Sequence, residues 1–271
     1  LCNLPVQSTT EQPDLDVAID VVLVGDGFVD MNAWHTSAAN AVARFKSQTA
    51  TGIYQTTLFN FHVVDVVSAT TNVSNTDTTD TALGGTTATL LRVNDGKANV
   101  AALNAPDVDV VVVILNGSGR ANANYPSQLT SGGAMRLSTD PNPISHEMGH
   151  ALFNLADEYV ETCTNPNESV MLRNRNVTAT AGCAKFSTTP GAGCVEGGMY
   201  CSTGVWRSAS SCLMRASGNA STCPVCQRTI AEMLLEKRSG VDVSEPWAVL
   251  SNPANGATVS GVFTPSSRGV A

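Results

Sequence analysis

The first half of the chain contains three runs that are apolar almost throughout, at residues 17–24, 58–68 and 108–115. Their β-branched and aromatic residues, bounded by turn residues, are typical of buried strands. Strands that are covered on both faces belong to parallel sheets with helices on either side. The pattern therefore predicts a mostly parallel, twisted sheet.

Helical patterns separate and follow these runs. They cover residues 30–48, part of 87–104, 145–154 and 224–238. Asp30 is suited to cap the first of these helices, because its carboxylate can accept a hydrogen bond from the first turn. Strands that alternate with helices in this way predict an α/β fold with helices on both faces of the sheet.

Two stretches show no clear period. Residues 69–89 are rich in Thr, Asn and Asp and predict a long surface loop, which is either solvated or placed near a substrate or a structural Ca²⁺ ion. Residues 160–222 carry most of the cysteines, and there the pattern predicts a loop-rich region.

These patterns divide the chain into a main domain at residues 1–245 and a short tail. Within the main domain we expect an α/β part at 17–159 and a disulfide-rich part at 160–240. After Pro246 the sequence resembles the first strand of an immunoglobulin-like module. Residues 246–271 are too few to complete such a module, so we interpret them as a linker and its truncated start.

Composition and charge narrow the classes of partner. The 271 residues carry a net charge of −8 without clusters of Lys and Arg, which is unsuited to nucleic acids and to anionic membrane surfaces. No apolar run approaches the ~18 to 20 residues that a membrane-spanning helix needs. No secretory signal opens the chain, so we expect that a secreted protein would already have lost it.

The cysteines point to secretion. They lie at positions 2, 163, 183, 194, 201, 212, 223 and 226. An even number concentrated in a loop-rich region indicates disulfides formed in an oxidising compartment. We predict the pairs Cys163–Cys183 and Cys194–Cys201, with Cys2, Cys212, Cys223 and Cys226 forming two more, although spacing does not determine connectivity.

The CxxC pair at Cys223 and Cys226 has a second interpretation, a structural zinc site. A zinc site of four thiolates needs another close pair of cysteines, and the sequence contains none. Disulfides are therefore the favoured interpretation of these cysteines.

The stretch ISHEMGHALFNLADEY, residues 144–159, carries the strongest chemical signal. His146 and His150 are four residues apart, so on a helix their imidazoles lie on one face, one turn apart. Both can bind one ion, while Glu147 lies beside it and can take a proton from a water molecule. This is the HExxH pattern of zinc hydrolases. Gly149 allows a neighbouring element to approach closely.

A catalytic zinc site also needs a third protein ligand. In a straight helix Asp157 would lie ~10 Å along the axis from His150, which is beyond reach. Asn154 tolerates the left-handed conformation that ends helices, and a turn there would bring Asp157 back over the ion. Spacing favours Asp157 as the ligand, and Glu158 is the alternative.

Several motifs in order resemble the bacterial IgA-peptidase-type zinc metallopeptidases. They are VVLVGDGF at 21–28, FNFHVVDVVS at 59–68, the HExxH stretch through LADEY, NVT at 176–178, and GVWRSASSCLMR with CPVC at 204–226. The likeness covers roughly residues 17–238. It implies a metzincin-like zincin domain in which His146 and His150 bind zinc, Glu147 is the general base, and the acidic residue of LADEY completes the site. Relatives commonly have Gly where this chain has Asn154.

The metzincin likeness suggests roles for three further residues. Met214 is either the methionine that lies beneath the metal in metzincins or a core residue. Tyr159 and Tyr200 are candidates to stabilise an oxyanion, although a tyrosine of this kind is more often a half-buried core residue. His35 and His62 have no companions in the sequence, and we interpret them as ordinary histidines.

We therefore predict a secreted zinc-dependent peptidase that cleaves protein or peptide substrates and is a monomer. The alternative is a zinc-containing cell-surface adhesion module built on a metallopeptidase fold. Hydrolysis of another amide or an ester would use the same residues. The sequence does not identify the substrate or the cleavage preference.

Overall fold

The structure, a computed structural model, describes residues 7–8, 18–49, 58–74, 80–87, 89–124, 134–163, 174–218 and 221–239. Its helices are α1 (Met31–Thr49), α2 (Asp95–Ala102), α4 (Ile144–Phe153), the 3₁₀ turn η2 (Ala184–Phe186) and α6 (Pro224–Ser239). Its strands are β1 (Gln7–Ser8), β2 (Ile19–Asp26), β3 (Phe59–Val64), β4 (Val110–Leu115), β5 (Met135–Leu137), β6 (Val177–Thr178), β7 (Val195–Gly198) and β8 (Cys201–Arg207).

A mixed sheet forms the centre of the α/β part, in the order β1-β3-β2-β4-β5. Strands β3, β2, β4 and β5 run parallel, and β1 pairs antiparallel with β3 at one edge. The prediction of a mostly parallel sheet in an α/β fold is confirmed. The short strand β5 escaped the sequence analysis because three residues carry too little periodicity.

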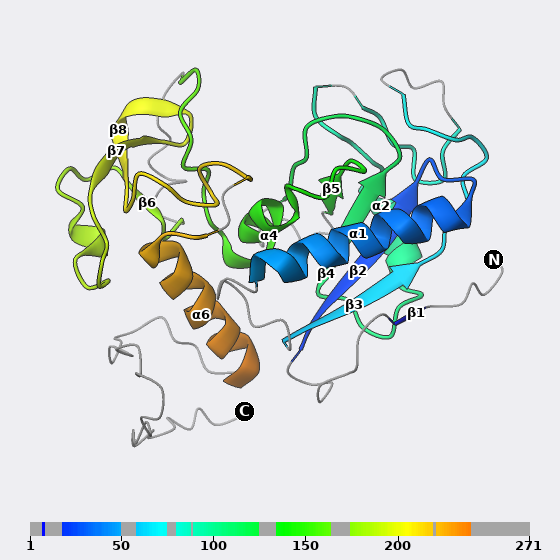
Figure 1. Cartoon of the computed structure of the whole chain (residues 1–271), viewed down its shortest axis with the longest axis horizontal. Coiled ribbons are helices and arrows are strands. Elements are labelled where there is room, and N and C mark those ends of the chain that lie inside the picture. The colour runs from blue at the N-terminus through cyan, green and yellow to red at the C-terminus, as the bar shows by residue number, and fades with distance from the viewer. Residues whose placement is uncertain are drawn as a thin grey trace, which may run out of the picture.

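Apolar side chains cover both faces of this sheet, as the sequence predicted. On one face α1 and α4 pack against β2, β3 and β4, with Trp34 and Phe45 fully buried. On the other face the small residues Ala98 and Ala102 let α2 approach Val22, Val24 and their neighbours. Figure 1 shows α1 lying across the sheet, with α4 near its left-hand end. Asp30 caps α1, since its carboxylate accepts a hydrogen bond from the N–H of Asn32.

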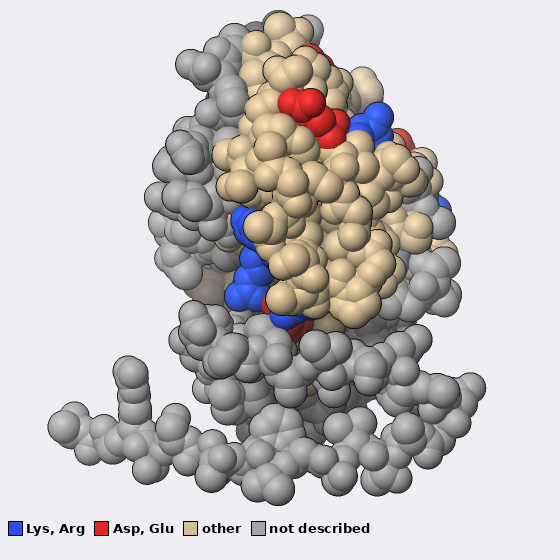
Figure 2. All heavy atoms as spheres, turned by 90° about the vertical axis from the view of Figure 1, so that its left-hand side faces the viewer, with Lys and Arg blue, Asp and Glu red and all other residues tan. Residues whose placement is uncertain are grey.

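The disulfide-rich part contains a small antiparallel sheet in the order β6-β8-β7. The sequence predicted loops here, and the strands were missed because two are very short and β7 contains two glycines. The part lies to the left in Figure 1, joined to the α/β part through α4 and α6. On the face it presents in Figure 2, uncharged side chains predominate among the described residues.

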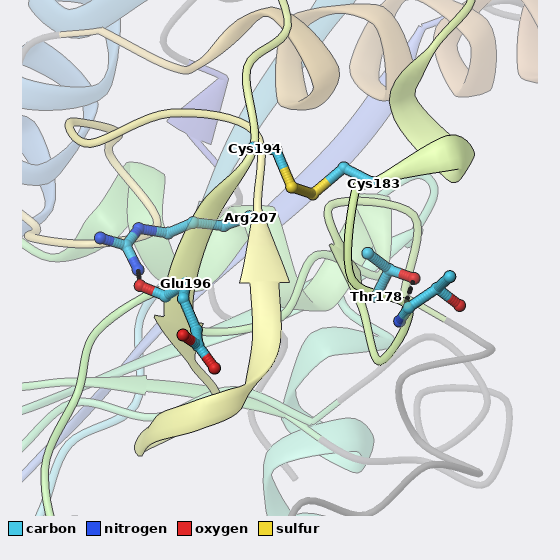
Figure 3. Close-up of a disulfide and its surroundings, with 6 residues drawn as sticks. Thr178, Cys183, Cys194, Glu196 and Arg207 are labelled. Atoms are coloured by element: carbon cyan, nitrogen blue, oxygen red, sulfur yellow. Dashed lines mark hydrogen bonds between the residues drawn. A yellow bond between two sulfur atoms is a disulfide. The ribbon is translucent and has the colours of Figure 1, made fainter.

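The predicted disulfide pairs are wrong, although the presence of disulfides is confirmed. Cys163 bonds to Cys201, and Cys183 bonds to Cys194. The second bond lies beside β7 and β8, where Arg207 donates a hydrogen bond to the carbonyl of Glu196 (Figure 3). The fold brings Cys201 to the segment after α4 and leaves Cys194 next to η2, a nested connectivity that spacing cannot reveal.

The other cysteines also differ from the prediction. Cys212, Cys223 and Cys226 carry buried thiols instead of disulfides. Cys2 and the predicted immunoglobulin-like start at 246–271 lie outside the described residues. Within the described ranges, no helix combines the length and the apolar character that crossing a membrane requires.

Candidate metal centre

Helix α4 places both histidines of the HExxH motif on one face and then ends as predicted. Asn154 adopts the left-handed conformation, with φ of 50° and ψ of 35°, and its N–H donates to the carbonyl of Gly149. The N–H of Leu155 donates to the same carbonyl at 3.0 Å. The chain reverses here, and the reversal carries Asp157 back to the two imidazoles.

Three side chains now converge on one point. The Nε2 atoms of His146 and His150 lie 3.2 Å apart, and Asp157 Oδ1 lies 3.0 Å from the first and 3.1 Å from the second. Ligands about 2.0 to 2.1 Å from a tetrahedral ion stand about 3.3 Å apart. The observed separations come close to that spacing, so this buried group could hold a metal ion.

Both imidazoles are oriented by hydrogen bonds on their other nitrogen. Nδ1 of His146 lies 3.0 Å from the carbonyl of Leu213, and Nδ1 of His150 lies 2.5 Å from the carbonyl of Leu155. A carbonyl only accepts, so each Nδ1 must be the protonated nitrogen. In the neutral imidazole, each Nε2 then directs its lone pair at the shared point, which is the tautomer that metal binding requires.

Asp157 is held from both sides. Tyr200 donates its hydroxyl hydrogen bond to Asp157 Oδ2 at 2.6 Å, and Tyr159 donates to the Tyr200 hydroxyl at 3.1 Å. Burial alone would raise the pKa of Asp157, but hydrogen bonds and positive charge from His146 and His150 in their protonated form outweigh it and hold that pKa well below its usual range. The carboxylate is therefore ionised and fixed in place.

Glu158, the alternative third ligand, faces away from this point. Its side chain is fully buried and lies against cysteine thiols, 3.4 Å from Cys226 Sγ. Adjacent residues in an extended segment point to opposite sides, so one acid reaches the histidines and its neighbour does not. The preference for Asp157 agrees with this geometry.

Glu147 lies beside the histidines on the wall of a cavity of about 890 Å³. Burial raises its pKa, and the neighbouring His146 and His150 offset part of that rise. The cavity is lined mainly by polar side chains from α4, from the loop after β4 and from the disulfide-rich part. They include Arg120, Asn122, Tyr159, Glu161, Tyr200 and Arg215.

Gly149 and Met214 pack closely against each other. A Cβ atom at Gly149 would come within 2.5 Å of the Met214 sulfur, so the glycine makes room for a fully buried methionine. The prediction of a close approach at Gly149 is confirmed. Met214 lies beneath the helix that carries the histidines, and the carbonyl of its neighbour Leu213 orients His146.

Arg120 was missed by the sequence analysis. It lies on the loop that follows β4 and donates a hydrogen bond to the Tyr159 hydroxyl, with its guanidinium 5.6 Å from the centre of that ring. Loops at the carboxyl ends of parallel strands commonly carry functional residues, and this was the available signal. A single arginine in a polar loop was too weak a pattern to single out.

Other predicted features lie elsewhere. None of the described residues of the 69–89 loop lines the cavity or belongs to a group that could hold a metal ion, so a calcium ion there remains a prediction.

His35 and His62 also lie apart from the site. Each contacts an aspartate that the sequence did not reveal: His35 contacts Asp65 at 2.7 Å, and His62 contacts Asp20 at 2.6 Å.

No protein-family model and no curated protein sequence matches this chain. The resemblance to the IgA-peptidase type therefore depends on the quoted motifs alone.

Proposed function

We propose that the chain is a zinc metallopeptidase whose ligands are His146, His150 and Asp157. The observation that carries this proposal is the convergence of three oriented ligand atoms on one point at the edge of a cavity, with a buried glutamate next to them. Three protein ligands leave one position for water or substrate, which is typical of catalytic zinc and unlike the four protein ligands of structural zinc.

The donor set suits zinc. Two imidazole nitrogens and one carboxylate oxygen form a mixed set that zinc commonly binds, whereas calcium and magnesium prefer oxygen ligands alone. When bound, a zinc ion polarises a carbonyl oxygen and makes nearby water more acidic.

In this proposal Glu147 is first the general base and then the general acid. Its carboxylate accepts a proton from the attacking water and then donates it to the leaving amine of the cleaved peptide. The raised pKa that burial gives Glu147 serves both steps, because it makes the carboxylate a stronger base without preventing later release of the proton.

Arg120 and Tyr159 are proposed to face the substrate. The Tyr200 hydroxyl is engaged with Asp157 and so orients a ligand. The half-exposed Arg120 stands next to it on the cavity wall and is oriented by Tyr159, which accepts its hydrogen bond. There the positive charge and the other N–H donors of Arg120 could stabilise the negative oxygen that develops during peptide hydrolysis.

Local features of α4 support a metzincin-like relationship. The helix ends in a left-handed residue, an acidic ligand follows three residues later, and Met214 packs beneath Gly149. The two disulfides support an extracellular location.

The proposal is tested by incubating the protein with a diverse peptide library, with and without a zinc chelator, and reading the products by mass spectrometry. We expect cleavage that the chelator abolishes. Glu147→Gln should lower the rate by about 10²-fold or more while zinc content stays unchanged. Glu196→Gln, the same substitution at an exposed position on β7, serves as the control and should cleave normally.

Full activity in Glu147→Gln, or cleavage that survives complete removal of zinc, would contradict the proposal. Zinc binding without any cleavage would favour the adhesion module instead.

A further inference from the structure

A second group of metal-ligating side chains lies behind the first. Glu158 and three cysteines bring ligand atoms within 4.8 Å of one another, and all four residues are buried. The cysteines are Cys212, which precedes Met214, and Cys223 and Cys226 at the start of α6. This group lies outside the cavity and has no part in the proposed cleavage.

The separations fit a tetrahedral metal better than a disulfide. With zinc–sulfur bonds of about 2.3 Å, two thiolates stand about 3.8 Å apart, and a thiolate and a carboxylate oxygen stand about 3.6 Å apart. Cys212 Sγ and Cys226 Sγ are 3.7 Å apart. Glu158 Oε1 lies 3.7 Å from Cys223 Sγ and 3.4 Å from Cys226 Sγ. A disulfide would need sulfurs about 2.05 Å apart.

One of the two carboxylate oxygens of Glu158 lacks a partner. Oε1 accepts a hydrogen bond from Asn176 at 3.0 Å, but Oε2 is buried without a hydrogen-bond partner. Among the ion pairs of the described residues, none involves Glu158. A buried acid beside three thiols is costly unless a cation lies among them.

Donors surround the sulfurs in the way that thiolate ligands require. The N–H of Cys223 donates to Cys212 Sγ at 3.2 Å, and the N–H of Cys226 donates to Cys223 Sγ at 3.4 Å. Ser208 donates its hydroxyl to Cys223 Sγ at 3.0 Å. Cys223 also directly precedes α6, whose amino end favours negative charge.

We propose that Cys212, Cys223, Cys226 and Glu158 form a structural zinc site. Three soft thiolates select zinc over calcium and magnesium, and four protein ligands close the coordination sphere. The sequence analysis rejected zinc for this CxxC pair because no second pair of cysteines was present. The fold supplies Cys212 and Glu158 from distant segments instead.

The second site would position the first. Glu158 follows Asp157 directly, and its N–H donates to the carbonyl of Met214 at 2.8 Å. Cys212 precedes Leu213, whose carbonyl orients His146. An ion held by Glu158 and Cys212 therefore fixes both segments that set the geometry of the catalytic ligands.

The test counts and characterises zinc in the purified full chain. We expect about two zinc ions per chain, and about one in a variant carrying His146→Asn and His150→Asn, which removes the first site. X-ray absorption of that variant should show a sulfur-rich shell at about 2.3 Å. Cobalt substituted for zinc there should give thiolate-to-metal charge-transfer absorption, which the histidine site cannot produce.

A thiol-modifying reagent provides a readout that does not depend on variants. In the native metal-loaded protein the three thiols should resist modification, and removal of zinc should expose them. Cys226→Ser should lower the zinc content by about one ion per chain. The control, a variant in which both Cys183 and Cys194 are replaced by Ser, should keep both ions.

A disulfide between any of the three cysteines in peptide mass spectra would overturn the proposal. So would a His146→Asn, His150→Asn variant that folds and binds no zinc. If only the histidine site failed to bind zinc, the result would be distinguishable. The unmodified protein would then contain about one zinc ion, and X-ray absorption would show sulfur ligands around it.

Discussion

At the scale of single residues, the site depends on hydrogen bonds that orient the metal-binding side chains. Asp157 offers one oxygen to the histidines and the other to Tyr200. The HExxH spacing predicted both histidines and Glu147, because a helix fixes which side chains share a face. Tyr200 lies in the turn between β7 and β8, and its contact with Asp157 could not be read from spacing.

Tyr200→Phe should weaken metal binding by about 10- to 100-fold, because the carboxylate loses the donor that orients it. Tyr159→Phe is the control, since that hydroxyl reaches Tyr200 and not Asp157. Zinc affinity is measured by competition with a chromogenic chelator. Equal affinity for the unmodified protein and Tyr200→Phe would refute the orienting role.

Asn154 provides a second test at this scale. Asn154→Ala should lower the free energy of unfolding by about 1 to 2 kcal/mol, because a left-handed backbone is costly for alanine, whereas Asn154→Gly should be tolerated. The measurement is urea denaturation of metal-free protein. A similar loss in both variants would show that the Asn154 side chain matters more than its backbone conformation.

At the scale of elements, the sequence predicted the buried strands and amphipathic helices but not what links them. The segment after α4 is held by Asn176, whose side-chain amide bonds both the N–H and the carbonyl of Ala156 at 2.8 Å. Asn174 donates to the carbonyl of Asn154 at 2.6 Å. These contacts join residues about twenty positions apart, and only the folded chain reveals them.

The two disulfides should contribute differently to the free energy of unfolding, because they close loops of different length. Cys163–Cys201 spans 38 residues and Cys183–Cys194 spans 11. Chain-entropy estimates give about 4 and about 3 kcal/mol, respectively. Replacing each pair by serines should therefore lower the free energy of unfolding more for the first pair, as measured by urea denaturation. The reverse order would show that loop closure does not dominate.

At the scale of the whole molecule, α4 joins the α/β part to the disulfide-rich part. The proposed catalytic ligands and the proposed structural ligands both include a residue of the segment 157–158, with partners in α4, in the loop after β8 and at the start of α6. The sequence predicted an α/β part followed by a disulfide-rich part. It also named Tyr200, which lines the cavity, as a candidate site residue, but it did not single out Arg215.

Metal removal should therefore destabilise the molecule as a whole. Free zinc at about 100 times the dissociation constant of a site adds about 2.7 kcal/mol per site to the free energy of unfolding. We expect the melting temperature to fall on chelation and to recover on addition of zinc, measured by calorimetry. A melting temperature that does not respond to zinc would contradict metal binding by the folded state.

The central claim, a metal ion held by His146, His150 and Asp157, is tested most directly by a crystal structure of the zinc-loaded protein. Anomalous scattering at the zinc edge identifies the ion without assumptions. We expect a peak about 2.0 to 2.2 Å from both Nε2 atoms and from the Asp157 carboxylate, with its remaining position open to the cavity. Side chains that diverge from one another, or a fourth protein ligand that closes the site, would contradict the claim.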